Sequence, residues 1–218
     1  MDVAEVDASG PDAPQERAGY RRSTGSRRGE ARREELLERV SADLAVNGLV
    51  DFSLRRAARA AGTTHKVLLY YFDGPEDLLT RAIFRLRGRR IDRAMAAAAA
   101  GPAGRPLAER VRAVWPILLA EGTGERRVLD QAIGLSMYDP GRYAALGRDA
   151  SKQYLPSLVS ICPPGWSEQR KVQVAELVLA ALRGFLIDWM TSGDDPAGAE
   201  AGFAALVRAL EREEAADE

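Results

Sequence analysis

The sequence has 218 residues, 46% of them hydrophobic, which is enough apolar material for one large domain or for a small domain joined to a larger one. Its single cysteine, Cys162, excludes an intramolecular disulfide and a cysteine-cluster metal site, and its single histidine, His65, argues against a histidine-based catalytic pair or zinc site. A formal net charge of −1 favours no class of partner.

Positive charge is concentrated in the N-terminal part of the chain. Residues 1–16 carry five acidic and no basic side chains, residues 17–93 carry 18 Lys and Arg against 10 Asp and Glu, and residues 94–218 carry 13 against 17. A basic segment in an otherwise mildly acidic protein is typical of a module that faces nucleic acid. An arginine-rich helix surface in solvent would give the same balance, so charge alone leaves both interpretations open.

No segment has the composition of a signal peptide or a membrane span. The N-terminus is polar and acidic, without the apolar core of a secretory signal. The most apolar stretch, Val174–Met190, is interrupted by Glu176, Arg183 and Asp188 and falls short of a membrane span. We therefore expect a soluble cytoplasmic protein with neither a metal ion nor another cofactor.

The chain begins with a polar segment that shows no apolar periodicity, and we predict a disordered tail at 1–30. Its basic patch, Arg21–Arg28, fits either an arm for the DNA minor groove or a tail that only increases solubility. Helical periodicity begins at Ala31 and ends at Gly48, a common helix stop. The apolar residues that repeat at helical spacing within this segment are Leu37, Val40 and Leu44.

Two short helices are predicted next. Ser53 can cap the N-terminus of a helix at Leu54–Ala61, which Gly62 ends. Thr64 can cap a third helix that runs to about Tyr71. Isolated helices of this length are marginal in water, and small apolar residues allow the two to cross closely, which is the geometry of a helix-turn-helix.

The remaining chain predicts longer helices, because no segment shows sustained alternation of β-branched and polar residues. A fourth helix begins at Pro75, a residue suited to the first helical position, and runs to the alanines before Gly101. Breaks rich in Gly and Pro separate five further helices, which we place at Leu107–Glu121, Glu125–Met137, Gly141–Ser160, Glu168–Met190 and Ala197–Glu213. The prediction is an all-α protein of about nine helices, with a helix-turn-helix domain at 31–75 and a larger helical domain at 76–218.

The predicted third helix has two different faces. Leu68 shares one face with Thr64 and Phe72, and we assign that face to the core. The opposite, outward face consists of Lys66, Val67 and Tyr70, flanked by His65 and Leu69. A cation, an apolar contact and a phenol are groups that a DNA major groove can use for contacts to base edges, thymine methyls and phosphates. An ordinary exposed helix is the alternative interpretation.

Small, apolar and capping residues recur at a fixed spacing between residues 36 and 79. They are Gly48, Ser53, Leu54, Ala57, Ala58, Ala61, Gly62, Thr64, Leu68, Tyr71, Phe72, Glu76, Leu78 and Leu79. In spacing and residue type this set resembles the DNA-binding domain of the TetR/AcrR family of bacterial transcription regulators. The resemblance implies an architecture of roughly nine helices, a homodimer and double-stranded operator DNA as a partner.

The recognition helix departs from the family pattern. Lys66 stands where the family commonly has Gly, and Leu69 stands where Tyr is common and is followed by Tyr70. Pro75 replaces a common Lys and can donate no hydrogen bond to phosphate. We therefore expect the DNA contacts to be specific to this chain. The predicted DNA-binding residues are Arg32, Ser53, Thr64, His65, Lys66, Val67, Tyr70 and Tyr71.

The C-terminal part contains a helix that is apolar around most of its circumference from Leu177 to Met190, with a thin polar stripe at Glu176 and Arg183. Such a helix must be covered on more than one side, and Gly184 permits close approach of another helix. In TetR-like proteins the last two long helices of each protomer form a four-helix dimer interface. The final helix has an apolar stripe suited to that role, at Phe203, Leu206, Val207 and Leu210. Burial within the monomer is the alternative.

Large, adaptable side chains in the C-terminal part could line an apolar pocket for a small-molecule effector. The candidates are Trp115, Met137, Tyr138, Tyr143, Tyr154 and Trp189. Plain core packing is the alternative for each of them. Pro116 should kink its helix, which either opens a cavity or only fits the packing.

These features predict a DNA-binding transcription regulator, a repressor that binds a palindromic operator as a dimer and is released by a small apolar effector. We recognise no nucleophile–base pair, metal cluster or phosphate-binding loop in the sequence, so we expect no enzymatic activity. The alternative is a helical dimeric interaction module without effector sensing. A module that binds no DNA would also lack a salt-sensitive affinity for it.

Overall fold

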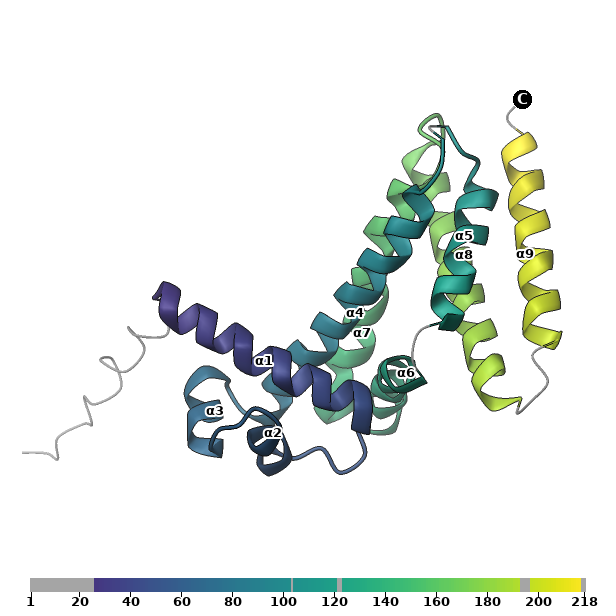
Figure 1. Ribbon diagram of the computed structural model, residues 1–218. Coiled ribbons are helices and arrows are strands. Elements are labelled where there is room, and N and C mark those ends of the chain that lie inside the picture. The colour runs from purple at the N-terminus through teal and green to yellow at the C-terminus, as the bar shows by residue number, and fades with distance from the viewer. Residues whose placement is uncertain (1–25, 103, 121–122, 193–196, 217–218) are drawn as a thin grey trace, which may run out of the picture.

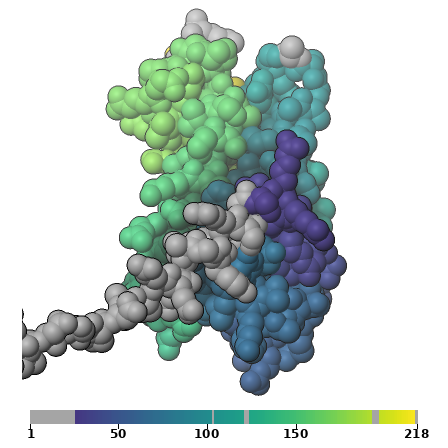
Figure 2. All heavy atoms as spheres, turned by 90° about the vertical axis from the view of Figure 1, so that its left-hand side faces the viewer, coloured from purple at the N-terminus to yellow at the C-terminus, as the bar shows by residue number. Residues whose placement is uncertain are grey.

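The computed structural model describes residues 26–102, 104–120, 123–192 and 197–216, and the regular structure in these residues is helical. The helices are α1 (Arg27–Asn47), α2 (Leu54–Ala60), α3 (His65–Tyr71), α4 (Pro75–Ala99), α5 (Leu107–Ala120), α6 (Thr123–Tyr138), α7 (Pro140–Ser160), α8 (Glu168–Thr191) and α9 (Ala197–Ala215). Figure 1 shows α1–α3 at one end of the molecule, with α4 and α7 leading from them to α5, α8 and α9. In Figure 2 the blue segments, which include α2 and α3, form the lower end, below the teal segments and most of the green ones. For the described residues, the predicted all-α class and the order of the helices are confirmed.

The first helix begins earlier than the sequence predicts. α1 starts at Arg27 rather than at Ala31. The Ser26 hydroxyl caps it by accepting a hydrogen bond from the Gly29 amide nitrogen at 3.1 Å. The last two arginines of the basic patch therefore belong to α1. The rest of the predicted tail, residues 1–25, lies outside the described residues and includes the start of the patch.

α2 and α3 form the predicted helix-turn-helix. The Ser53 hydroxyl caps α2 by accepting a hydrogen bond from the Arg56 amide nitrogen at 3.2 Å. Thr64 caps α3 in the same way through the Val67 amide nitrogen at 3.4 Å. Gly62 joins the two helices with a φ of +64°, a left-handed conformation that glycine adopts without steric strain. The two predicted caps and the turn at Gly62 are confirmed.

Apolar packing holds these short helices against α1. Leu68 of α3 is completely buried, in one cluster with Ala57 and Ala58 of α2 and the leucines of α1. The alanines leave room for α2 and α3 to cross closely. The predicted core positions Leu68 and Phe72 are confirmed, whereas Thr64, which we placed on the same face, is exposed because it precedes the first turn of α3.

Two arginines fix the loops around α2. The Arg56 guanidinium donates to the Asp43 carboxylate at 2.8 Å and to two carbonyl oxygens of the loop between α1 and α2. Arg39 of α1 donates to the Ala61 carbonyl oxygen at 3.2 Å, at the end of α2. Carbonyl groups at helix ends lack partners within their own helix, and these side chains supply them. These contacts fix both ends of α2 against α1.

The apolar interior consists of two clusters that share α4. One cluster joins α1–α3 to the first half of α4 and extends to Val128 of α6 and Leu146 of α7. The other joins the second half of α4 to α5, α7, α8 and α9. The helix-turn-helix is therefore packed directly on the helices that follow it, and the apolar interior does not divide at residue 75.

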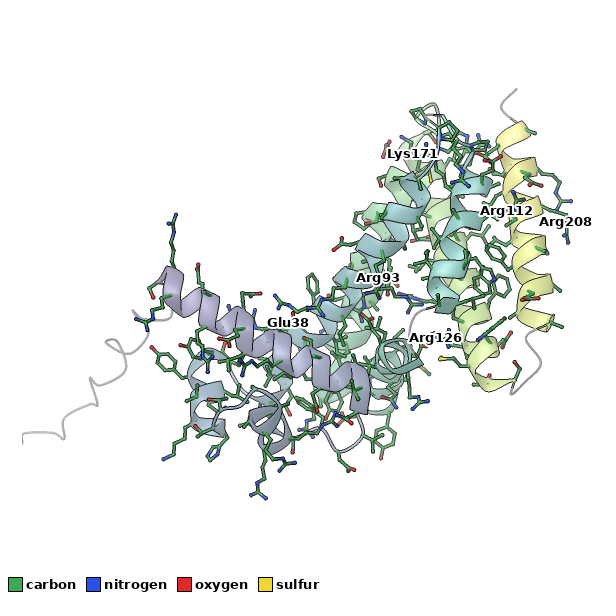
Figure 3. The ribbon with its side chains drawn as sticks, viewed as in Figure 1. Glu38, Arg93, Arg112, Arg126, Lys171 and Arg208 are labelled. Carbon is green, nitrogen blue, oxygen red and sulfur yellow. The ribbon has the colours of Figure 1, made fainter. Side chains whose placement is uncertain are left out.

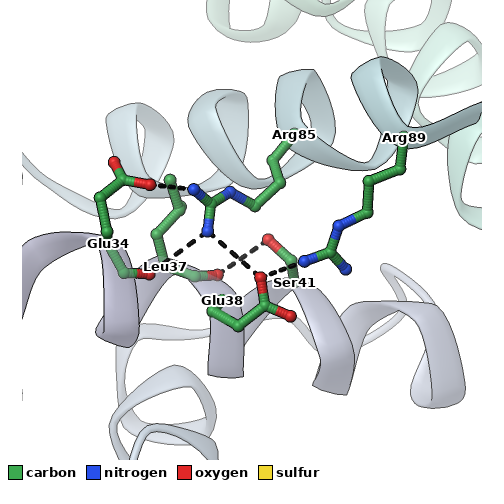
Figure 4. Close-up of polar contacts among 6 residues, drawn as sticks. All are labelled: Glu34, Leu37, Glu38, Ser41, Arg85 and Arg89. Atoms are coloured by element: carbon green, nitrogen blue, oxygen red, sulfur yellow. Dashed lines mark hydrogen bonds and ion pairs between the residues drawn. The ribbon is translucent and has the colours of Figure 1, made fainter. Parts of the chain in front are cut away.

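Ion pairs also join α1 to α4. Arg85 of α4 donates to the carboxylates of Glu34 and Glu38 of α1, and Arg89 donates to Glu38 (Figure 4). Arg85 donates in addition to the Glu34 carbonyl oxygen at 3.3 Å. Glu38 points from α1 toward α4 in Figure 3. The Arg89 guanidinium, together with that of Arg85, holds the pKa of Glu38 below its ordinary value of 4.5.

The apolar stripe of the last helix faces the protein's own core. Phe203, Leu206, Val207 and Leu210 of α9 are buried in the cluster formed with α5 and α8. The prediction that this stripe forms the dimer interface is wrong, because a helix packed on α5 and α8 turns its largest apolar side chains toward them. The exposed side of α9 instead carries small residues such as Ala201, Ala204 and Ala205.

We expect Glu38→Gln to lower the free energy of unfolding by about 0.2–1 kcal/mol at neutral pH, the range for solvent-exposed ion pairs. The amide keeps the size of the side chain and removes the charge that Arg85 and Arg89 bind. Because the pKa of Glu38 is lowered in the folded protein, its contribution is present above pH 4.5 and is lost as the pH falls below that value. Urea unfolding at neutral and acidic pH measures the difference, with Asp92→Asn, exposed on α4, as the control. An equal loss at both pH values would contradict a role for the charge.

Candidate functional site

The outward face of α3 is the candidate nucleic-acid interface. Thr64, His65 and Lys66 are exposed at its N-terminal end, and Leu69 is 49% exposed one turn further on. Lys66 lies on the side of α3 opposite the buried Leu68, since two residues span more than half a helical turn. This end of the helix therefore offers a cation, an imidazole, a hydroxyl and an apolar side chain to a partner.

Two residues that we predicted to face DNA lie partly in the core. Val67 and Tyr71 are half-buried and pack against the cluster that contains Leu68. The buried arc of α3 is thus wider than the single stripe that helical periodicity assigns to it. These two side chains contribute to holding α3 in place, and the assignment of Val67 to the outward face is wrong.

Tyr70 and Arg32 lie together in a groove between the start of α1 and the end of α3. Both line this groove, together with Tyr71. The ring of Tyr70 meets that of Tyr71 edge-on, with 4.9 Å between centroids. Arg32 donates to the Glu35 carboxylate at 2.6 Å and lowers the pKa of that group. The fold therefore brings three of the predicted DNA-binding residues to one surface.

The sequence prediction missed two exposed arginines on α2. Arg55 and Arg59 lie one turn apart and are exposed, opposite the buried Ala57 and Ala58. Arg56, between them in sequence, turns inward and fixes the loop before α2. The signal was present in the sequence, because arginines four residues apart and opposite an alanine face indicate an exposed basic stripe.

The six residues predicted to line a ligand pocket do not all lie at one cavity. Met137 and Tyr138, on the last turn of α6, are 76% and 88% exposed. Tyr143 of α7 packs against the N-terminal cluster, with the Arg142 guanidinium 5.1 Å from its ring centre. Of the six candidates, only Tyr154 lines the cavity described below. These residues were chosen for the size of their side chains, and size does not indicate which way a side chain points from its helix.

Trp115 belongs to an aromatic cluster between α5, α8 and α9. Its ring stacks on that of Phe203, with centroids 4.6 Å apart. Phe185 and Trp189 meet it edge-on at 6.3 Å and 6.5 Å. Such contacts are typical of a packed core, which favours the alternative of core packing for Trp115, whose side chain is 7% exposed. That Trp115 and Trp189 line a ligand pocket stays a prediction.

A cavity lies among α4, α5, α6, α7 and α8. Its volume is about 70 Å³, counted as the space that the centre of a water molecule can occupy. That is several times the roughly 10–15 Å³ needed for a single water, so the cavity has room for a small organic molecule. Most of the lining is aliphatic. The polar side chains that line it are Arg87, Arg90, Asp130, Tyr154, Ser157 and Arg183.

Buried arginines around this cavity were not predicted from the sequence. Arg87 and Arg90 occupy the same face of α4 as Ile83 and Ala94, at the spacing of core positions, which was the available signal. Arg126 of α6 is also buried and donates to a carbonyl oxygen of α5 at 3.5 Å; Figure 3 shows it beside the end of α5. The interior of the larger part of the chain therefore contains several buried cations, with the half-buried carboxylate of Asp130 near them.

A metal-binding cluster and a membrane-spanning helix are both absent from the described residues. In that part of the chain His, Cys, Asp and Glu side chains form no group of three or more that could hold a metal ion. None of its helices combines the length and the apolar character needed to cross a bilayer. The absence of a cofactor and of enzymatic activity stays a prediction.

Comparison with known proteins identifies the fold. No protein-family model matches the sequence, and no curated protein matches it either. A protein of Mesorhizobium loti MAFF303099 described as a TetR-family transcriptional regulator has a solved structure that matches with a TM-score of 0.62, at 16% identity, over 85% of this chain and 97% of its own. The chain has the TetR fold.

Other solved structures give the same result. A protein of Streptomyces coelicolor A3(2) described as a transcriptional regulator matches with a TM-score of 0.64 and 20% identity, over 81% of this chain and 96% of its own. The multidrug binding protein EbrR, solved in complex with proflavin, matches with a TM-score of 0.61 and 18% identity, over 81% of this chain and 98% of its own. Sequence identities of 16–20% with these structural matches establish the TetR fold. The chemistry of each site has to be argued from this chain's own residues.

We expect Trp115→Ala to lower the free energy of unfolding by about 3–5 kcal/mol, because it removes a buried ring that packs on three others. Met137→Ala, at an exposed position, should change it by no more than about 0.5 kcal/mol. Urea unfolding of both variants measures the contrast. A Trp115→Ala variant as stable as the parent chain would show that the aromatic cluster is not part of the core.

Proposed function

We propose that the protein is a DNA-binding transcription regulator that acts as a homodimer and responds to a small molecule. The observation that carries this proposal is the exposed N-terminal end of α3. There Thr64, His65 and Lys66 are accessible on a helix that Leu68 fixes from behind. The transcriptional regulators that share the TetR fold support the same conclusion.

The groups on this surface suit duplex DNA. Lys66 can donate to base edges or phosphates, and Leu69 can contact a thymine methyl group in the major groove. Arg55 and Arg59 of α2 are exposed cations for the phosphate backbone. Because Lys66 stands where TetR-like sequences commonly have Gly, we expect it to contribute most to the sequence preference peculiar to this chain.

Selection of bound duplexes from a random DNA pool tests the proposal and yields the operator. The full-length protein should enrich an inverted repeat, since a two-fold dimer repeats its contacts on both half-sites. The affinity should fall steeply between about 50 and 200 mM salt, because phosphate contacts release counterions. A pool without enrichment, or an affinity independent of salt, would contradict DNA binding by this surface.

Lys66→Ala and Tyr70→Phe should weaken operator binding and leave folding and dimerisation unchanged. A lost base contact costs about 1–3 kcal/mol and relaxes the preference at one position. A lost phosphate contact lowers the affinity for all sequences and reduces the salt slope by about 0.9. Lys152→Ala, exposed on α7, is the matched control. If both variants bind the operator like the parent chain, α3 does not read the groove.

The proposed dimer uses the exposed sides of α8 and α9. Leu177 and Ile187 of α8 are 53% and 47% exposed, and Ala180 and Gly184 lie between them on the same side. The exposed side of α9 carries alanines. A second copy can pack on this face, and small residues let the helices approach closely. Two-fold pairing here would present two copies of α3 to successive major grooves.

Gly184→Leu should weaken this dimer without disturbing the single chain. A Cβ on Gly184 has no neighbour within 4 Å outside its own helix, so the variant should fold. Between two α8 helices the leucine would overpack the interface, at a cost of about 1–3 kcal/mol. Sedimentation or light scattering measures the result, with Gly134→Leu as the control, since that glycine also has no such neighbour. A parent chain that is monomeric at micromolar concentration would overturn the interface itself.

α4 connects the cavity to the helix-turn-helix. Arg87 and Arg90 of α4 line the cavity, while Arg85 and Arg89 of the same helix bind carboxylates of α1. A molecule that changes the position of α4 would therefore change that of α1 as well. Such coupling requires only that the ligand bind one arrangement of these helices better than the other.

α6 makes a second connection. Asp130 lines the cavity, and the next residue, Gln131, accepts a hydrogen bond from the Leu49 amide nitrogen at 2.9 Å. The start of α6 lies against the end of α1, where a Cβ on Gly124 would be 1.9 Å from the Ala45 carbonyl oxygen. A ligand that moves α6 would alter the separation of the two recognition helices in the dimer and release the operator. We therefore propose a ligand-responsive repressor, which acts by binding and needs no catalytic group.

A further inference from the structure

The cavity among α4 to α8 has a lining whose charges do not balance. Arg87 and Arg90 of α4 and Arg183 of α8 line it, and Asp130 is the one acid among the described lining residues. Arg87 and Arg90 are only 3% and 5% exposed. Arginine stays protonated in proteins, so the lining carries a net positive charge even when Asp130 is ionised.

Neutral groups hold two of these arginines. Arg87 donates to the Leu146 carbonyl oxygen at 3.2 Å and to the Gln153 side-chain oxygen at 3.4 Å. Arg183 donates to the Ser151 hydroxyl at 3.0 Å. Burial lowers the pKa of both guanidinium groups. Tyr154 opposes this shift for both, and Arg90 adds to it. Each group has one carboxylate that also opposes the shift, Asp149 for Arg87 and Asp130 for Arg183, so both are desolvated cations with other cations and a single acid nearby.

Two buried polar atoms beside the cavity make no hydrogen bond with any described part of the chain. They are Nη2 of Arg183 and Oδ2 of Asp130. A buried N–H group of a cation is costly without an acceptor, and a carboxylate oxygen is the acceptor that binds it most strongly. The Arg183 guanidinium lies 5.5 Å from the centre of the Tyr154 ring, which limits its orientation.

We propose that this cavity binds an organic acid whose carboxylate is held by Arg183 together with Arg87 and Arg90. Its hydrocarbon body would pack on the aliphatic lining, which includes Leu118 and Leu182. The volume of about 70 Å³ suits a compact body. This ligand class replaces the wholly apolar effector expected from the sequence, and its role as an effector rests on the proposed function.

The charges of the lining argue against the two other ligand classes. A cation would gain one contact with Asp130 and would face three arginines, which repel it in a site shielded from water. A neutral apolar molecule would fill the aliphatic part and leave the Nη2 donor of Arg183 without an acceptor. The carboxylate of an acid offsets the positive charge and supplies the acceptor that Nη2 of Arg183 lacks.

Three probes with the same eight-carbon body separate these classes: octanoate, 1-octanol and octylamine. Titration calorimetry on the full-length protein without DNA should give octanoate a dissociation constant at least about tenfold lower than that of octanol, because only the acid makes charge-assisted hydrogen bonds. Octylamine should not bind. Octanol binding as tightly as octanoate, octylamine binding more tightly than either, or no binding by any of the three overturns the proposal.

Arg183→Gln should weaken octanoate binding about tenfold and leave octanol binding unchanged. Arg112→Gln is the matched control, because Arg112 is exposed on α5, where it pairs with Glu211 at 2.9 Å (Figure 3). Thermal unfolding verifies that each variant is folded. If Arg183→Gln does not fold, the affinities of the parent chain for octanoate, 1-octanol and octylamine are sufficient to test the proposed acid site. Unchanged octanoate affinity in a folded Arg183→Gln variant overturns the assignment of the carboxylate to Arg183.

DNA binding measured separately distinguishes this inference from the proposed function. Octanoate binding by a protein that enriches no operator supports the acid site and contradicts the regulator. Operator binding without octanoate binding contradicts the acid site alone. If octanoate lowers operator affinity, linkage requires the operator to lower octanoate affinity by the same factor. That reciprocal measurement tests whether the acid site and the DNA-binding surface are coupled.

Discussion

The burial of α4 in both apolar clusters is the constraint on which the other helices depend. Its first half closes the core behind the helix-turn-helix, and its second half forms a wall of the cavity. At 1.5 Å per residue, this helix of 25 residues is about 38 Å long, so it reaches from the helix-turn-helix to the cavity. Arg85 and Arg89 on one side and Arg87 and Arg90 on another give the same helix two sets of charged contacts.

Much of the fold could be predicted because its determinants are local. The caps at Ser53 and Thr64, the left-handed turn at Gly62 and the start of α4 at Pro75 each depend on a few neighbouring residues. The start of α1 was missed because Ser26 lies among arginines, where no apolar repeat marks a helix. A helix cap depends on one hydrogen bond and leaves no periodic pattern in the sequence.

The sites were less predictable because their geometry depends on contacts between distant segments. Val67 was assigned to the outward face from helical spacing, but α3 is buried over a wider arc than one stripe. Arginine is ordinarily a surface residue, so the core positions of Arg87 and Arg90 were overlooked although their spacing was regular. Which way Met137 and Tyr138 turn is determined by where α6 ends relative to α7, and no local pattern encodes that.

The close approach of α6 to α1 limits how this protein can evolve. The atom nearest to a Cβ on Gly124 belongs to the main chain of Ala45, so a smaller side chain at position 45 cannot make room for it. Every substitution at position 124 therefore displaces a helix, and a single second mutation cannot restore the contact. We expect this glycine to persist among close relatives while its exposed neighbours vary. An alignment of such relatives would then reveal, from sequence alone, where the helix-turn-helix contacts the helices that line the cavity.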